Sequence, residues 1–358
     1  MTSVSHAESG GIRMVTLYDV AKSAGVSPKT VSRVLNGDGP VGKATRDSVE
    51  AAMQALGYVP SSAARALRSA KSGLIGVVSG AISYTDDNPL LAGLPEIYIL
   101  RGIQDVLDEK RLTVLLTDTG GRADAAPGLL NTLARHRVDG TIYVAPFHQQ
   151  VALPPPTAVS APLVVANGFA DDATSAVVPD DYTGQRVLVD GLIARGHRRI
   201  AYLQLPHALL ATQHRTRAYE DAHRAAGLPL DPGLMIVADR VDDDAEARTA
   251  TLQHAIAALL ATSPLPTAIC CGNDRMALAV YGMLRARGLR IPDDISVAGY
   301  DDYRLISETL YPALTTVALP YREIGRQAAR LLTEPQSGTR RITVPGPVHW
   351  RDSVTTIT

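Results

Sequence analysis

The chain has 358 residues, more than a single hydrophobic core usually organises, so two or three domains are expected. Hydrophobic residues make up 46% of it and the mean hydropathy is +0.03, which fits an ordinary water-soluble protein with full-sized cores. No apolar run approaches the roughly 18 residues of a transmembrane helix, so the sequence predicts neither such a helix nor a membrane partner.

The net charge of −1 conceals an uneven distribution. Residues 15–71 contain eight Lys and Arg residues against four acidic ones, a balance of +4, whereas residues 72–358 carry −5. A basic N-terminal part on an acidic body is typical of a module that meets phosphate groups, although an ordinary solvated surface also gives small excesses of this kind.

Residues 1–14 lack the apolar core of a secretory signal and are expected to form a short disordered tail. The only cysteines, Cys270 and Cys271, are adjacent within the apolar run TAICC. Two adjacent cysteines form neither a disulfide framework nor a four-ligand zinc site, so buried free thiols and a reducing cytoplasm are predicted.

A first short helix is expected directly after the tail. Thr16 is placed to cap it, because a threonine side chain at this position accepts a hydrogen bond from the first turn. Leu17, Val20 and Ala21 fall on one face of this helix. The pair Gly25-Val26 then makes a tight turn, which ends the helix and reverses the chain.

Two more helices follow the turn. Ser27 is the cap of the second helix, which begins at Pro28, since the first helical residue needs no N–H, and ends at Asn36. The third helix is predicted over 43–56, with apolar residues at i, i+3, i+4 and i+7. Two helices joined by a short turn that contains glycine form a helix-turn-helix.

From Gly73 onward, short apolar runs alternate with helical stretches, which are predicted at 98–110, 183–195, 216–226, 247–261 and 275–287. The runs are LIGVVSG, LTVLLTD, GTIYVAP, LVVANG, RIAYLQL, TAICCGN and ISVAGYD. Continuous apolar strands between helices predict parallel sheets that are covered on both faces. Seven such strands fit two doubly wound lobes better than one large sheet.

The segment VTLYDVAKSAGVSPKTVSRVLN at 15–36 closely resembles the N-terminus of the lactose-repressor (LacI/GalR) family of bacterial regulators, and so does the following TRDSVEAAMQALGYVP. The resemblance continues in LIGVV, GLIARGHRRIAYL, CGNDRMALA and ISVAGYDD and covers about residues 15–355. It implies an all-α helix-turn-helix head and an α/β, two-lobed, periplasmic-binding-protein-like body made of two doubly wound parallel sheets.

The resemblance also divides the chain into domains. The expected parts are a disordered tail at 1–14, a helix-turn-helix domain at 15–59, a hinge helix or linker at 60–72, an N-terminal lobe at 73–177 and 319–342, and a C-terminal lobe at 178–318 and 343–358.

The N-terminal half of the second helix is the part of a recognition helix that reaches base edges in the major groove. Arg33 is suited to read guanine through two hydrogen bonds, worth about 1–3 kcal/mol of discrimination. Lys29 and Thr30 are as well placed to contact phosphate as to contact a base. Ser27, Ser32 and Asn36 are expected to be phosphate contacts or helix caps. By resemblance, Tyr18 contacts the DNA backbone. The expected DNA contacts of the head are Thr16, Tyr18, Ser27, Pro28, Lys29, Thr30, Ser32, Arg33 and Asn36.

The segment SSAARALRSAK at 61–71 has one large apolar residue, Leu67, which is too little to pack a helix by itself. In the resembled family this hinge becomes a minor-groove helix when two protomers pair over DNA, and a leucine wedges into the central base step. Leu67 matches that leucine, and Ala64, Arg65 and Arg68 are expected to contact DNA beside it. The alternative is a plain linker.

The body is expected to bind a small-molecule effector between its lobes, at the carboxyl ends of the strands. Arg215 in RTRAY, Asn273 in GND and Asp301 in GYDD match effector positions of the family, and together they suit the adjacent hydroxyls of a polyol. Each of them alone is an ordinary loop residue, and Asn273 is also a helix cap. The expected effector contacts are Asn88, Arg215, Arg240, Asn273, Asp301 and Tyr321.

Two departures from the family pattern bear on the effector. A loop that often reads Asn-Pro-Phe-Phe is here Asn88-Pro89-Leu90-Leu91, followed by an apparent insertion. Arg240 falls near the position where relatives often place an aromatic ring over the sugar. The stacking surface is therefore altered, and the effector is expected to be a sugar or a sugar derivative, neutral or charged.

The sequence as a whole predicts a sequence-specific, effector-responsive regulator, which in this family is most often a repressor. It is expected to form a homodimer whose two heads reach a pseudo-palindromic operator in double-stranded DNA, in the cytoplasm and on the nucleoid when bound. No catalytic constellation, phosphate loop or zinc spacing indicates an enzyme, a cofactor or a metal. The alternative is a soluble sugar-binding protein without DNA-binding activity.

Overall fold

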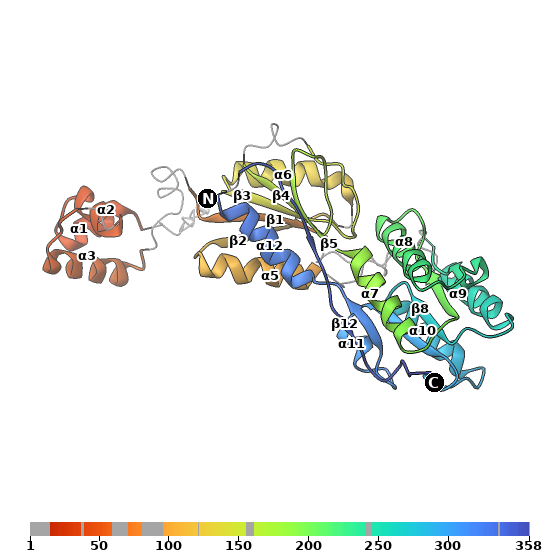
Figure 1. The fold of residues 1–358 in the computed structure, drawn as a ribbon. Helices are drawn as coiled ribbons and strands as arrows, with labels where there is room; N and C mark the ends of the chain where they lie inside the picture. The colour runs from red at the N-terminus through yellow and green to blue at the C-terminus, as the bar shows by residue number, and fades with distance from the viewer. Residues whose placement is uncertain are drawn as a thin grey trace, which may run out of the picture. The chain divides into compact units, whose positions relative to one another are not determined.

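The computed structural model in Figure 1 describes residues 15–36, 39–58, 71–80, 96–120, 122–154, 161–240, 245–335 and 337–357. The chain divides into two compact units, Met1–Ser72 and Gly73–Thr358. The predicted tail, the predicted hinge contacts and the loop that contains Asn88 lie outside the described residues. Within the described part, no helix is long and apolar enough to cross a membrane.

In the described part of the N-terminal unit, three helices lie where the sequence predicts them: α1 (Leu17–Ala24), α2 (Pro28–Asn36) and α3 (Lys43–Leu56). Thr16 and Asp19 form a capping box at the start of α1, in which the Asp19 carboxylate accepts from the Thr16 N–H at 2.8 Å and the Thr16 hydroxyl accepts from the Asp19 N–H at 3.4 Å. Gly25 ends the helix with a φ of 67°, a conformation that glycine adopts without steric cost.

One small core holds these helices together. Val20 and Ala21 of α1, Val31 of α2, and Val49 and Ala52 of α3 are buried against one another. The three helices are too short to be stable alone, so the packing of these apolar faces makes the unit cooperative.

The first lobe of the larger unit is built on a six-stranded sheet with the strand order β2-β1-β3-β4-β5-β11, and all of its pairings are parallel. Its strands are β1 (Leu74–Ser79), β2 (Thr113–Asp118), β3 (Gly140–Val144), β4 (Leu163–Ala166), β5 (Ser175–Pro179) and β11 (Arg341–Val344). Its helices are α5 (Glu96–Glu109), η2 (Ala123–Ala125), α6 (Ala126–Arg135) and α12 (Tyr321–Thr333).

Helices cover both faces of this sheet (Figure 1). Ile75 and Val77 of β1 pack in the same cluster as α5 and α12, whereas Val78 packs in the cluster of α6, because successive residues of a strand point to opposite faces. The backbones of α5 and α12 approach closely: a Cβ atom on Gly102 would lie 1.9 Å from the carbonyl oxygen of Arg322.

The second lobe repeats this plan with the strand order β7-β6-β8-β9-β10-β12, in which only the β10–β12 pair is antiparallel. Its strands are β6 (Ile200–Gln204), β7 (Met235–Val237), β8 (Ala268–Cys271), β9 (Ser296–Asp301), β10 (Thr315–Ala318) and β12 (Val348–His349). Its helices are α7 (Asp181–Ala194), α8 (Leu210–Ala225), η4 (Pro232–Leu234), α9 (Ala245–Leu260), α10 (Asp274–Arg285) and α11 (Arg304–Ser307).

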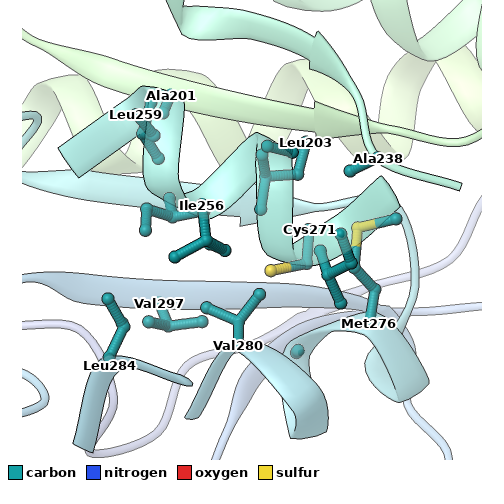
Figure 2. Packing of buried hydrophobic residues seen from close by; sticks show 14 of the residues in the cluster. Ala201, Leu203, Ala238, Ile256, Leu259, Cys271, Met276, Val280, Leu284 and Val297 are labelled. Carbon is teal, nitrogen blue, oxygen red and sulfur yellow. The ribbon is translucent and has the colours of Figure 1, made fainter. Parts of the chain in front are cut away.

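Figure 2 shows the core on one face of the second sheet, where Ile256 of α9 and Val280 of α10 meet the strand residues Leu203, Cys271 and Val297. The opposite face packs against α7 and α8. The two adjacent cysteines therefore point to opposite faces of β8, and both thiols are free and buried, as the sequence predicts.

Three segments connect the lobes, after β5, β10 and β11. They lie side by side, because the Asp180 N–H donates to the carbonyl of Val344 and the Ala318 N–H donates to the carbonyl of Pro347. A Cβ atom on Gly346 would lie 1.7 Å from the carbonyl oxygen of Ala318, so only glycine fits where two of the crossings touch. The first sheet extends to Pro179 and Val344.

Candidate functional site

The head presents a polar surface on the side of α2 away from its core. Lys29 and Arg33 are exposed and lie four residues apart, so they share one face of the helix, opposite the buried Val31. Tyr18 at the start of α1 is 72% exposed, which is unusual for so large a ring. Together these side chains form a basic, aromatic-edged surface suited to the phosphates and base edges of DNA.

Two of the expected DNA contacts also have structural roles. Thr16 belongs to the capping box of α1. The Ser27 hydroxyl accepts from the Thr30 N–H at 3.1 Å and lies 2.9 Å from the Thr30 hydroxyl, so it caps α2 directly after the turn. These hydroxyls fix the N-terminus of α2, the end that a recognition helix offers to DNA.

The remaining expected DNA contacts of the head differ in exposure and in their place on α2. Pro28 is exposed, Ser32 is partly buried, and Asn36 is the last residue of α2. The hinge candidates Ala64, Arg65, Leu67 and Arg68 lie outside the described residues, so the minor-groove wedge stays a prediction.

The body has a switch point in each sheet, where the strand order reverses between β1 and β3 and between β6 and β8. Ligands of open α/β sheets bind beyond the carboxyl ends of the strands at such points. In the second sheet, Gly272 and Asn273 follow β8 directly, and α8 begins shortly after β6. A site at this edge therefore includes α8 and the first turn of α10.

Arg215 of α8 is buried at this edge, with 4% of its surface exposed. Its Nε donates to Oδ1 of Asp181 at 2.7 Å, Nη2 lies 2.6 Å from the same oxygen, and Nη1 donates to the carbonyl of Gly272 at 2.8 Å. The guanidinium stacks on the ring of Tyr300. Arg215 thus contacts Gly272 and Tyr300, the residues that directly precede Asn273 and Asp301 in the chain.

Asp181 is the first residue of α7, and its side chain is fully buried. Burial by itself raises the pKa of a carboxyl group, but the charge of Arg215 and the hydrogen bond with His148 outweigh it and hold the pKa of Asp181 below its ordinary value. The Asp181 carboxylate is therefore ionised at neutral pH and neutralises the buried guanidinium.

Asn273 and its neighbour Asp274 begin α10. The Asn273 side chain accepts from the Met276 N–H at 2.8 Å, so it caps the helix, as the sequence analysis allowed. The buried Asp274 accepts from the Thr316 hydroxyl at 2.6 Å and from the Tyr303 N–H at 2.7 Å. Burial raises the pKa of Asp274 to about 7, and the two hydrogen bonds only partly offset it.

Asp301 ends β9 with a φ of 121°, a backbone conformation that non-glycine residues rarely adopt and that marks strained functional sites. Burial, followed by the nearby charge of Asp274, raises the pKa of Asp301 well above its ordinary value, while Arg215 acts in the opposite sense. The pKa of Tyr321 is also raised, by burial first and then by the charge of Asp301. Arg215, Asp301 and Tyr321 therefore influence one another electrostatically.

A pocket of about 300 Å³ opens next to these residues, between elements of the two lobes. Asp301 and Tyr321, two of the expected effector contacts, line it. Its lining residues are Tyr98, Asp301, Asp302, Tyr303, Arg304, Ala318, Leu319, Pro320, Tyr321, Arg322, Glu323 and Arg326.

The structure thus brings together four of the six expected effector residues: Arg215, Asn273, Asp301 and Tyr321. Arg240 is exposed and follows β7, while Asn88 lies outside the described residues. Sequence reasoning missed His148 and Asp181. The signal was their place in the segments that follow the buried strands β3 and β5, where a polar residue reaches the edge that binds ligands.

Both the head and the body of this chain match known protein families. Residues 16–61 match the model of the lacI family of bacterial regulatory proteins, and residues 189–354 match that of a periplasmic binding protein-like domain. The sucrose operon repressor of Escherichia coli is 35% identical over 94% of this chain and 98% of its own length. The HTH-type transcriptional regulator CelR of Thermobifida fusca is 34% identical over 91% of this chain and 93% of its own.

Solved structures agree with these matches. A lac repressor dimer bound to operator and the anti-inducer ONPF is 26% identical, with a TM-score of 0.74 over 96% of this chain and 100% of that one. A CelR–cellobiose complex is 30% identical, with a TM-score of 0.63 over 95% of this chain and 99% of that one.

A helix-turn-helix head joined to a two-lobed α/β body defines a DNA-binding transcription regulator, not an enzyme. The chain belongs to the lacI family of bacterial regulatory proteins.

Proposed function

We propose that this regulator is a repressor whose body binds a sugar or a sugar derivative at Arg215, Asn273, Asp301 and Tyr321, with Asn88 and Arg240 completing the site. The observation that carries the proposal is the buried Arg215, held at the switch point of the second sheet by Asp181 and Tyr300. Its contacts with Asp181 and Gly272 occupy three of the five N–H groups of a guanidinium, and we expect the other two to donate to neighbouring hydroxyls.

Sucrose and cellobiose are the first ligands to test, because the names of two relatives refer to them. In a thermal-shift screen of sucrose, cellobiose and ribose, at least one sugar should raise the unfolding temperature, since a ligand that binds only the folded state stabilises it. Asp301→Ala should abolish that shift, whereas Asp293→Ala, which removes an exposed carboxylate of the same lobe, should leave it intact. If the Asp301→Ala variant keeps the full shift, the effector site is placed wrongly.

We further propose that α2 reads the operator through Pro28, Lys29, Thr30 and Arg33, while Thr16, Tyr18, Ser27, Ser32 and Asn36 contact phosphates and Ala64, Arg65, Leu67 and Arg68 enter the minor groove. A homodimer would place two heads on one pseudo-palindromic site, in the cytoplasm and on the nucleoid. The lac repressor relative, seen as a dimer on operator DNA, supports this arrangement.

Selection of binding sites from random DNA tests the DNA half. The wild-type protein should enrich one palindrome. Arg33→Ala should weaken binding to this palindrome by roughly 5- to 150-fold, which is the contribution of one base contact made through two hydrogen bonds. Arg46→Ala removes the same charge from α3 and should keep the sequence preference. Recovery of no preferred sequence by the wild-type protein would contradict operator reading.

A further inference from the structure

His148 connects the two lobes at the effector edge. It lies in the segment that follows β3 of the first lobe, and its Nδ1 is 2.6 Å from Oδ2 of Asp181, the first residue of α7 in the second lobe. The side chains of His148 and Asp181 are 8% and 0% exposed. Solvent therefore screens this contact little, unlike the ion pairs on the surface of the molecule.

Rings from both lobes surround the same imidazole. His214 of α8 stacks on His148, with ring centroids 5.8 Å apart and an angle of 13° between the planes. Phe169 of the first lobe meets His148 edge-on at 6.5 Å. The imidazole is thus held by packing from both sides and by one directional hydrogen bond across the gap between the lobes.

The Asp181 carboxylate divides its two oxygens between the lobes. Oδ1 pairs with Arg215 inside the second lobe, and Oδ2 bonds to His148 of the first. When the lobes separate, the carboxylate loses His148 but keeps the Arg215 guanidinium, so the charge is never left buried without a partner. A contact of this kind breaks and re-forms without the large penalty of an orphaned charge.

We propose that His148 is a positioning residue that couples closure of the lobes to the orientation of Arg215. In the closed arrangement, His148 fixes Asp181, and Asp181 fixes the plane of the guanidinium that faces the effector. The coupling is reciprocal: an effector held by Arg215 stabilises the closed arrangement, and the closed arrangement presents Arg215 correctly. The role of Arg215 in this coupling rests on the effector site proposed above, whereas the contact between the lobes does not.

Two substitutions separate the hydrogen bond from the ring. His148→Asn retains a donor near the position of Nδ1 but loses the ring, while His148→Phe retains a ring that can stack on His214 but has no donor. His136→Phe, at an exposed histidine of the same lobe, is the matched control. Circular dichroism checks that every variant is folded.

The closing experiment measures the distance between the lobes in the effector-free full-length protein. Spin labels are placed at Asn131→Cys on α6 and Gln253→Cys on α9, both exposed, and each labelled protein is assembled with excess unlabelled protein. The native thiols are buried, and burial raises the pKa of Cys270 to about 12, so they label slowly. Double electron–electron resonance then gives the distance distribution.

The wild type, His148→Asn and His136→Phe should give the same narrow distribution, and His148→Phe a longer or broader one. An unchanged distribution in His148→Phe, or an equal broadening in His148→Asn, overturns the proposal. Titration with sucrose and cellobiose forms the second arm. His148→Phe should weaken binding of whichever sugar binds by roughly tenfold, the value of a hydrogen bond to a charged group, and His148→Asn by less than about threefold.

The two arms fail separately. If neither sugar binds but the distance distributions differ as expected, the contact between the lobes stands and the assigned effector is wrong. If a sugar binds the wild type and His148→Phe equally well, the coupling to Arg215 is wrong, whatever the effector site contains.

Discussion

The guanidinium of Arg215 lies flat on the ring of Tyr300, with its Cζ 3.5 Å from the ring centroid. The same guanidinium pairs with Asp181, so one buried cation is neutralised at its edge and covered on its face. A planar cation is needed for both contacts at once, since an ammonium group offers neither the fork of donors nor the flat surface.

Removal of this cation is expected to destabilise the body strongly. Arg215→Ala leaves the Asp181 carboxylate buried next to His148 alone, and the loss of one partner of a buried pair costs about 3–5 kcal/mol. Arg215→Lys should restore only part of the lost free energy of unfolding. Urea unfolding of the full-length protein measures this free energy for both variants.

The control for this prediction is Arg186→Ala, which breaks a partly exposed pair with Asp190 on α7. Exposed ion pairs contribute little, so the unfolding midpoint should hardly move. An equal loss of stability in Arg186→Ala and Arg215→Ala would show that the buried pair contributes no more to stability than the partly exposed one.

The capping box at Thr16 should stabilise the head locally. Thr16→Ala removes the hydroxyl that accepts from the Asp19 N–H and should cost about 1 kcal/mol. Hydrogen exchange of the full-length protein should show faster exchange in α1 and little change in the body. Gln54→Ala, at an exposed position of α3, should leave the exchange of α1 as it is in the wild type.

Stability should fall in mild acid because of His197. This fully buried imidazole lies 3.0 Å from the Thr267 hydroxyl and 3.1 Å from the carbonyl of Thr355, and burial lowers its pKa below the ordinary value. Near pH 6.5, His197 becomes protonated in the unfolded chain but stays neutral in the folded chain, so the unfolded state binds more protons. The stability of the fold therefore decreases as the pH falls through that value.

Unfolding temperatures at pH 7.5, 6.5 and 5.5 test this sign. His197→Gln removes the titrating group and should flatten the decrease between pH 7.5 and 5.5, even if it lowers stability at every pH. A decrease as steep in the variant as in the wild type would assign the acid sensitivity to another group, such as His223, whose pKa burial also lowers.

The close approach of α5 and α12 makes two glycines sensitive to substitution. A Cβ atom on Gly102 or on Gly325 would lie about 2 Å from a backbone carbonyl oxygen of the facing helix, so Gly102→Ala and Gly325→Ala should destabilise the first lobe by about 1–3 kcal/mol. Gly128 in α6 has open space around the same position, and Gly128→Ala should stabilise by about 0.5–1 kcal/mol. Urea unfolding compares the three, and a loss in Gly128→Ala as large as in Gly102→Ala would contradict the steric explanation.

Among the described residues, the helices α6, α11 and α12 were not predicted from the sequence. α6 begins with Ala126-Pro127-Gly128, a combination that usually marks a turn. α12 carries an amphipathic pattern that was overlooked: Ile324, Gly325, Ala328, Ala329 and Leu331 form its buried face. Gly325 on this face allows the close approach of α5.

The effector site was predictable only in part. Arg215, Asn273 and Asp301 lie in recognisable motifs, and the structure brings them to one edge of the second sheet. Arg240 and Asn88 also come from motif matching, but Arg240 is an exposed residue after β7 and Asn88 lies outside the described residues. Motif matching finds a residue's place along the chain but not the neighbours that fix its side chain.

The sequence by itself determined the head, because helix caps, turn glycines and apolar periodicity act between residues a few positions apart, as Thr16 and Asp19 do. It also determined that the body has two parallel sheets, since strands buried on both faces need continuous apolar runs. Only the tertiary structure decided that Arg215 pairs with Asp181, 34 residues away, and that Asp181 turns its other oxygen to His148, 33 residues away in the other lobe. Those contacts depend on which strand ends meet at one edge and on how the crossings seat one lobe against the other. No local pattern in the chain records either.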